Sequence, residues 1–277
     1  MPDKDYSNKV VIVTGAAAGI GRAISRQFVD AGMRVCAMDI KPDGVKELES
    51  EFGRDRLLAQ HVDVTDPASC HAAVTAARKH FGALHCLVNN AALGMNAVHP
   101  DYTSGQLQIE DVDEALWQRF MITNACGPFF MTRQVVPHMR KQEWGRIINV
   151  GTSYFTMMRP GFAPYGPSKA VLEAYTVMLA RELEGTGITV NVVIPGGPAD
   201  TQMVPDEEGL DRATLIPPAM MAPPMLGLFE DSASGVTGCR FRAVDWSDTI
   251  RDPSRQEMRS AAWPELSTPL ASLPKAG

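Results

Sequence analysis

Tyr165 and Lys169 lie four residues apart in the run F-A-P-Y-G-P-S-K-A at 162–170. On a helix, residues at i and i+4 are neighbours on one face, roughly 5–6 Å apart at Cβ. Pro167 between them is tolerated in a first helical turn, where its missing N–H has no partner within the helix. A nearby ammonium favours the ionised form of a phenol. The pair could therefore transfer protons near neutral pH; the alternative is two amphipathic side chains on a helix surface.

A glycine-rich run, T-G-A-A-A-G-I-G at 14–21, follows the apolar run at 10–13 and opens a helical pattern that continues to Ala31. Glycines at 15, 19 and 21 leave room for a tight turn and for a pyrophosphate at the N-terminus of the helix. The run lacks the G-K-S/T ending of a nucleoside-triphosphatase loop. Its place between a strand and a helix favours a dinucleotide site over a simple tight turn.

Asp39 ends the second predicted strand, 24 positions after Gly15. A carboxylate at about this distance from the glycine loop can accept hydrogen bonds from the hydroxyls of the adenosine ribose. The same charge would repel a 2′-phosphate, so NAD is favoured over NADP. Lys41 is close enough to soften that preference.

Short apolar runs and longer amphipathic runs alternate over the first 195 residues. Strands are predicted at 10–13, 33–38, 57–64, 84–88, 146–150 and 189–194, with helices through Ala31 and at about 66–81, 112–139 and 164–184. Strands that alternate with helices indicate a parallel sheet with helices on both faces. We expect a doubly wound α/β fold whose ligand crevice lies at the carboxyl ends of the strands.

The composition is that of an ordinary globular chain. A net charge of −6 argues against nucleic acid as a partner, and the six histidines lack zinc-type spacing, so no metal site is expected. The five scattered cysteines suit reduced thiols in a cytoplasmic protein. The N-terminus lacks the apolar core of a signal peptide, and no apolar run approaches the roughly 20 residues of a membrane span. We expect no membrane partner.

Two long irregular segments interrupt the pattern, at 93–111 and 195–227, and loops of this length are often functional. Nothing marks a domain boundary. We expect one catalytic domain over 1–245, which includes the substrate loop 195–227, and a tail or interface arm over 246–277.

From about residue 8 to residue 245 the chain resembles the short-chain dehydrogenase/reductase family. Seven motifs that resemble this family's occur in its order: T14-G-A-A-A-G-I-G21, D63-V64, N89-N-A-A92, N124-A-C-G-P-F129, Y165-G-P-S-K169, V190-N-V-V-I-P-G196 and S232-A-S-G-V-T-G238. The resemblance implies a single Rossmann-type domain.

The resemblance also implies roles for individual residues. Tyr165 would be the general acid/base at the substrate oxygen, and Lys169 would lower its pKa and hold the nicotinamide ribose. A serine would fix the substrate oxygen, and Asn124 would support a proton relay. Residues implied in cofactor binding are Gly15, Gly19, Ile20, Gly21, Asp39, Asp63, Val64, Asn90, Ala91, Tyr165, Lys169, Pro195, Gly196 and Thr201.

Four departures from the family pattern affect this assignment. The usual offset of the serine before the tyrosine lands on Thr152, while Ser153 lies one residue later; we favour Ser153, with Thr152 as the alternative. The run P-G-G-P-A-D-T at 195–201 is one residue longer than usual, although Thr201 remains the candidate for the carboxamide contact. The connection at 93–111 is long and should reshape the substrate pocket. The last strand reads F-R-A-V-D-W at 241–246, where the family often has V-D-G-G, and this bears on the subunit interface.

We therefore expect an NAD-dependent enzyme that interconverts a secondary alcohol and a ketone, both small molecules, and forms a homotetramer or dimer. Two alternatives stay open. One is an NADPH-dependent 3-oxoacyl-thioester reductase, although NADP-using members often carry a basic residue where this chain has Ala18. The other is a redox sensor that binds NAD without turnover, for which a tuned tyrosine would have no use.

Overall fold

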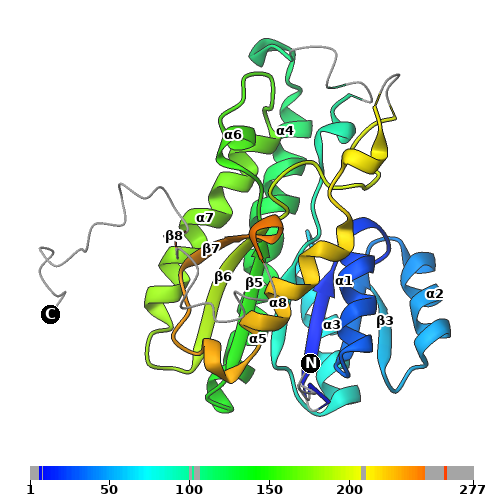
Figure 1. Ribbon diagram of the computed structural model, residues 1–277, viewed down its shortest axis with the longest axis vertical. Helices are drawn as coiled ribbons and strands as arrows, with labels where there is room; N and C mark the ends of the chain where they lie inside the picture. Colours follow the sequence, from blue (N-terminus) through cyan, green and yellow to red (C-terminus); the bar gives the residue numbers. More distant parts are fainter. Residues whose placement is uncertain are drawn as a thin grey trace, which may run out of the picture.

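The computed structural model describes residues 6–7, 9–99, 102, 107–206, 210–246 and 259–260. Its strands form one sheet in the order β3-β2-β1-β4-β5-β6-β7-β8 (Figure 1). Strands β1 to β7 pair in parallel, and β8 is antiparallel to β7. The bounds are β1 (Val10–Thr14), β2 (Arg34–Asp39), β3 (Leu57–His61), β4 (Cys86–Asn89), β5 (Gly145–Val150), β6 (Ile188–Ile194), β7 (Cys239–Arg242) and β8 (Arg259–Ser260). The predicted Rossmann-type doubly wound fold is confirmed.

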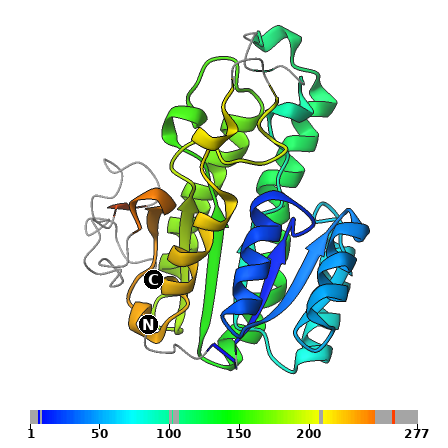
Figure 2. The same cartoon turned by 45° about the vertical axis from the view of Figure 1, so that its right-hand side comes forward.

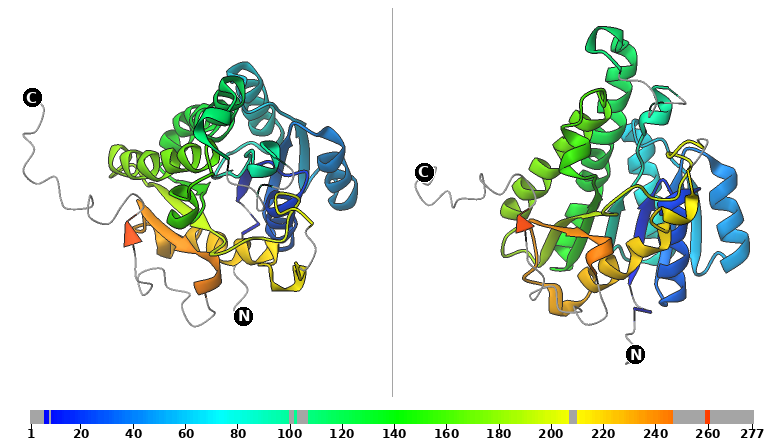
Figure 3. Two further views of the ribbon diagram at one scale, coloured as in Figure 1. Left: turned by 90° about the horizontal axis from the view of Figure 1, so that it is seen from above. Right: turned by 45° about the horizontal axis from the view of Figure 1, so that its top comes forward.

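Helices cover both faces of this sheet (Figure 3, left). Their bounds are α1 (Gly19–Asp30), α2 (Pro42–Phe52), α3 (Pro67–Phe81), α4 (Glu114–Met121), α5 (Gly127–Lys141), α6 (Tyr154–Met157), α7 (Tyr165–Glu182) and α8 (Ala222–Leu228). Alternate residues of β1 serve two hydrophobic cores, because successive side chains of a strand point to opposite faces. Val11 and Val13 pack with α1, α2 and α8, whereas Val10 and Ile12 pack with α3, α5 and α7.

Local signals explain where elements begin and end. The carboxylate of Asp66 caps α3 by accepting from the amide of Ala68 at 2.8 Å, and Pro67 occupies the first turn. Gly82 ends the same helix in the left-handed conformation, at φ 81°.

Four segments differ from the prediction. Helix α2 was not predicted. A Cβ at its Gly44 would meet Cβ of Ala17 at 2.7 Å, so the glycine lets α2 approach the glycine-rich loop. The helix predicted at 112–139 is α4, a π-helical segment at Ile122–Cys126 and α5. The irregular segment 195–227 contains α8, and the last parallel strand is Cys239–Arg242, so it begins two residues before the predicted 241–246 and ends within that range.

The loops that carry the predicted site lie at the carboxyl edge of the sheet, and α6 and the segment after β6 are both at this end of the molecule (Figures 1 and 2). This is the edge at which ligands bind in open α/β sheets, beside the point where strand order reverses between β1 and β4. Within the described residues, no helix combines the length and apolar character required for a membrane span. The predicted tail at 246–277 lies outside the described residues, apart from Trp246 and β8.

Candidate active site

Helix α7 begins at Tyr165 and fixes Lys169 against the end of β5. The Lys169 side chain is 3% exposed, and its Nζ donates to the carbonyl of Val150 at 2.9 Å. Ser168 Oγ donates to the carbonyl of Tyr165 at 2.7 Å, which ties the first turn of the helix to itself. Tyr165 and Lys169 thus lie one helical turn apart at the start of α7, and Lys169 contacts the last residue of a central strand.

Burial shifts both groups toward their neutral forms. It raises the pKa of Tyr165 to about 12, and a side-chain hydrogen bond with Thr152 opposes that shift. It lowers the pKa of Lys169 to about 8. Lys169 can therefore exchange a proton near neutral pH, and Thr152 favours the ionised phenol. The lowering of the Tyr165 pKa by Lys169 stays a prediction.

The two candidate hydroxyls after β5 have different partners. Ser153 caps α6: its Oγ accepts from the amide of Thr156 at 3.0 Å and lies 2.8 Å from Thr156 Oγ1. The Thr152 hydroxyl instead acts on Tyr165, where it lowers the pKa of the phenol against the effect of burial. The structure therefore brings Thr152, which the sequence ranked second, to the phenol and turns Ser153 toward α6. Thr152 also stands at the family's usual offset before the tyrosine.

Asn124 lies in the π-helical segment between α4 and α5 and is 1% exposed. Its Oδ1 accepts from the amide of Leu93 at 2.8 Å, and its Nδ2 donates to the Leu93 carbonyl at 3.0 Å. The same Nδ2 donates to Ser168 Oγ at 2.9 Å. Asn124 thus joins the loop after β4 to the first turn of α7, next to Lys169. Single π turns inside helices are frequent at functional sites.

The glycine-rich loop fits a dinucleotide. Gly15 has φ +68°, and a Cβ there would meet Cα of Ala91 at 2.8 Å; at Gly21 it would meet the Gly15 carbonyl oxygen at 2.0 Å. Ala18, the N-cap of α1, makes no side-chain cap, so the first amides of the helix keep their donors for an anion. Ile20, in the first turn of α1, packs against the hydrophobic core that contains α1, α2 and α8.

Asp39 is held at the end of β2 by backbone amides. Its Oδ2 accepts from the amide of Ala17 at 2.9 Å, and its Oδ1 accepts from the amide of Lys41 at 2.8 Å. The carboxylate is thereby fixed beside the glycine-rich loop, where the sequence places the adenosine ribose.

The other predicted cofactor residues in the amino-terminal half are Asn90, Ala91, Asp63 and Val64, and threonine hydroxyls bond the first three. Oγ1 of Thr14 accepts from the amides of Asn90 and Ala91 at 3.0 and 3.1 Å. Oδ1 of Asp63 accepts from the amide and hydroxyl of Thr65 at 2.9 and 2.7 Å. Val64 packs against α5, since a Cβ at Gly127 would meet its Cγ2 at 3.1 Å.

The segment after β6 reaches back to the glycine-rich loop. Gly196 turns the chain at φ +103°, and the Pro195 carbonyl accepts from the amide of Val244 at 3.2 Å. A Cβ at Gly19 would meet Cγ2 of Thr201 at 3.1 Å, so Thr201 lies against α1 at its N-terminus. The contact of Thr201 with the nicotinamide carboxamide stays a prediction.

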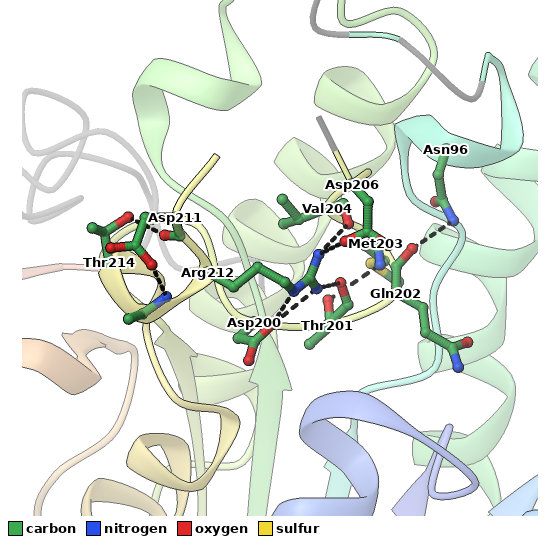
Figure 4. A network of polar contacts seen from close by, with 11 residues as sticks. Asn96, Asp200, Thr201, Gln202, Met203, Val204, Asp206, Asp211, Arg212 and Thr214 are labelled. Carbon is green, nitrogen blue, oxygen red and sulfur yellow. Dashed lines mark hydrogen bonds and ion pairs between the residues drawn. The ribbon is translucent and has the colours of Figure 1, made fainter. Parts of the chain in front are cut away.

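Arg212 holds this segment, and sequence reasoning missed it. Its guanidinium donates to Asp200 Oδ1 at 2.8 Å, to Asp206 Oδ1 at 2.5 Å and to the carbonyl of Thr201 at 3.1 Å (Figure 4). On the other side, Asn96 Nδ2 donates to the Gln202 carbonyl at 3.2 Å. The two predicted pocket loops, 93–111 and 195–227, are therefore in contact. Five acidic residues within 200–211 were the signal that could have pointed to an arginine partner.

Comparisons with known proteins identify the family of this chain. The sequence profile described as short chain dehydrogenase matches residues 9–209. The 3-oxoacyl-(acyl-carrier-protein) reductase of Salmonella typhimurium is 35% identical over 191 residues, which cover 69% of this chain and 74% of the relative. The NADP-dependent 3-hydroxy acid dehydrogenase of Escherichia coli is 33% identical over 189 residues, covering 68% of this chain and 71% of that protein.

One solved structure is also similar: the 3-ketoacyl-(acyl-carrier-protein) reductase of Brucella melitensis complexed with NADH. It has a TM-score of 0.73 and 27% identity, and the match covers 86% of this chain and 97% of that one. The chain belongs to the short-chain dehydrogenase/reductase family and is an oxidoreductase that uses a nicotinamide cofactor.

Proposed function

We propose that the protein is an NAD(H)-dependent dehydrogenase that interconverts a secondary alcohol and a ketone, with Tyr165 as general acid/base. The observation that carries the proposal is the cluster at the carboxyl edge of the sheet. There Thr152 lowers the pKa of the Tyr165 phenol, one helical turn from a buried Lys169. The glycine-rich loop and Thr201 lie at the same edge.

In the oxidation direction, the nicotinamide supplies the acceptor for the hydride that leaves the alcohol carbon. Tyr165 Oη takes the hydroxyl proton of the substrate, and the hydroxyl of Thr152 hydrogen-bonds the substrate oxygen. Lys169, whose pKa is about 8, returns the phenol to its starting protonation state through solvent. Asn124 holds the helix turn that carries both groups through Ser168. In the reduction direction, the neutral phenol donates its proton to the carbonyl oxygen.

Asp39 supports NAD over NADP. Two backbone amides fix its carboxylate beside the glycine-rich loop, and a fixed negative charge there repels a 2′-phosphate. Ala18 supplies no cation for that phosphate. Among the similar proteins, one is described as NADP-dependent and another was solved with NADH, so relatives do not decide the point.

Reduction of a 3-oxoacyl thioester with NADPH is the second candidate, because similar proteins in Salmonella typhimurium and Brucella melitensis carry that description. A redox sensor that binds NAD without turnover is the third. The arrangement of Thr152, Tyr165 and Lys169 favours an enzyme over a sensor, since binding alone needs no positioned acid.

Exposed apolar side chains support a homo-oligomer, for which we propose a tetramer with a dimer as the alternative. Ile122, Phe129, Val171 and Met178 are 38–48% exposed on the helices that contain Asn124 and Tyr165. We also propose a cytoplasmic location, since all five cysteines are free thiols. The proposed partner is a small alcohol or ketone. We propose neither a nucleic acid nor a membrane as a partner.

The test is turnover with a defined panel. Isopropanol, cyclohexanol, α-methylbenzyl alcohol, lactate and β-hydroxybutyrate are each offered with NAD and with NADP, and acetoacetyl-CoA is offered with NADH and with NADPH. The proposal expects NADH formation with at least one alcohol and weaker use of NADP. Turnover confined to acetoacetyl-CoA and NADPH would support the second candidate. Tight NAD binding without turnover on any compound would support the sensor.

A further inference from the structure

A buried ion pair lies directly beneath the candidate site. Glu173 stands one turn after Lys169 on α7 and two turns after Tyr165, and it is fully buried. Arg240 on β7 is 8% exposed and forms an ion pair with Oε1 of Glu173. Burial raises the pKa of Glu173 to about 7, and the charge of Arg240 opposes that shift.

The pair supports the segment that follows β5. A second guanidinium nitrogen of Arg240 donates to the carbonyl of Thr152 at 2.5 Å. The guanidinium carbon lies 4.1 Å from the centre of the Tyr154 ring. A Cβ at Gly151 would come within 3.3 Å of Glu173 Oε1, so the chain passes over the carboxylate at close range. Arg240 therefore contacts Thr152 and Tyr154, the two neighbours of Ser153. Among the described residues, its interactions do not include the glycine-rich loop.

Stability alone does not account for this pair. Two buried charges lose their hydration, and well-packed apolar residues of similar volume often stabilise a protein as well or better. The planar fork of arginine, in contrast, can hold a carboxylate and a carbonyl in one fixed geometry, which no apolar side chain can do. The contact with Thr152 is the one feature of the pair that reaches the reacting groups.

We propose that Arg240, anchored by Glu173, is a positioning residue that sets the backbone of Thr152 and so aims its hydroxyl at Tyr165 and the substrate oxygen. The inference rests on the proposed function. It assigns to β7, otherwise the edge of the parallel sheet, a part in the geometry of the acid/base site.

Arg240→Met is the principal test, with Arg242→Met as its matched control. Arg242 follows two residues later on β7, is about half exposed and pairs only with Asp245 among the described residues. Arg240→Met should fold, because removing the charge lets Glu173 remain protonated and neutral in its buried site. We expect kcat on the best panel alcohol to fall about 10- to 100-fold with little change in the Kd for NADH, as misplacement near 1 Å can cost this much. Arg242→Met should match the wild type.

A structural role and a positioning role are separated by combining variants. If Arg240 acts through Thr152, then Arg240→Met should lower kcat little further in a Thr152→Ala background, whereas independent effects would multiply. Arg240→Lys should restore part of kcat at best, because an ammonium lacks the fork. The pair Glu173→Leu with Arg240→Met, which packs apolar groups together, should keep the thermal midpoint and still lose kcat.

Three results decide the matter. Loss of kcat in Arg240→Met that disappears in the Thr152→Ala background supports the inference. Wild-type kcat in Arg240→Met, or full multiplicative loss in the double variant, overturns it while leaving the proposed function intact. Wild-type protein that binds NADH but turns over no panel compound overturns the proposed function and this inference with it.

Discussion

Thr152 and Ser153 are adjacent hydroxyl residues, and we expect them to have different tasks. The Thr152 side chain lowers the pKa of the Tyr165 phenol, and the Ser153 side chain accepts from the amide of Thr156. A helix cap contributes to stability, whereas a hydroxyl on the reacting oxygen contributes to the rate. Substitutions of the two residues can therefore be distinguished, because one should change the rate and the other the stability.

Thr152→Ala should lower kcat by about 10²-fold or more, because it removes the hydroxyl that favours the ionised phenol and the proposed contact with the substrate oxygen. Thr152→Ser should keep most of the activity. Ser153→Ala should leave kcat nearly unchanged and lower the free energy of unfolding by about 0.5–2 kcal/mol through loss of the cap. Steady-state kinetics and urea unfolding on the three variants check this. A large kcat loss in Ser153→Ala with an active Thr152→Ala would reverse the assignment.

At the scale of elements, the segment after β6 depends on one side chain. Arg212 bonds the Thr201 carbonyl, Asp200 and Asp206, and so closes the turn that lies against Gly19 (Figure 4). A loop already ordered before the ligand arrives spares the entropy cost of ordering on binding.

Arg212→Ala should therefore raise the Kd for NADH several-fold, with a smaller effect on the thermal midpoint, since the site is at the surface. Arg212→Lys should behave similarly, because a point charge cannot bond both carboxylates and the carbonyl. Titration of NADH fluorescence measures the affinity. An unchanged Kd in both variants would show that the turn orders without the guanidinium.

Elements with strong local patterns could be predicted from the sequence. The β-branched run of β1, the glycine-rich loop and the pair at the start of α7 each follow from residues close together in the chain. Helix α2 was missed because Gly44 is there for close packing on Ala17, a contact across the fold. The choice between Thr152 and Ser153, and the reach of Arg212 and Arg240, also depend on contacts between distant segments. Periodicity carries no information about such contacts.

At the scale of the whole molecule, a large hydrophobic core lies on each face of the sheet. A polar cluster of His85, Lys9 and Arg34 lies at the amino end of its strands. His85 exchanges two hydrogen bonds with Val10: its amide donates to the Val10 carbonyl at 2.9 Å, and its Nδ1 accepts from the Val10 amide at 3.0 Å. Burial lowers the pKa of His85 to about 4, and the charges of Lys9 and Arg34 add to this. The folded protein therefore favours the neutral form of the His85 ring.

This depressed pKa makes a prediction about stability. Below the ordinary histidine pKa of about 6.5, the unfolded chain binds a proton that the folded chain refuses, so the free energy of unfolding should fall as pH drops toward 4. His85→Asn keeps an acceptor for the Val10 amide and cannot titrate, so its stability should fall less over the same range. Urea unfolding at about pH 7 and about pH 5 compares the two. Parallel losses in both proteins would assign the pH dependence to other groups.

The acid/base role of Tyr165 is the central claim, and removal of one oxygen atom tests it most directly. Tyr165→Phe keeps the ring that packs at the start of α7 and deletes the proton carrier. With NAD and the panel alcohols, the wild type should form NADH, and the variant should bind NADH as tightly while turnover falls by about 10²–10⁴-fold. Turnover near the wild-type rate in Tyr165→Phe would contradict the account, because the proton would then leave through another group.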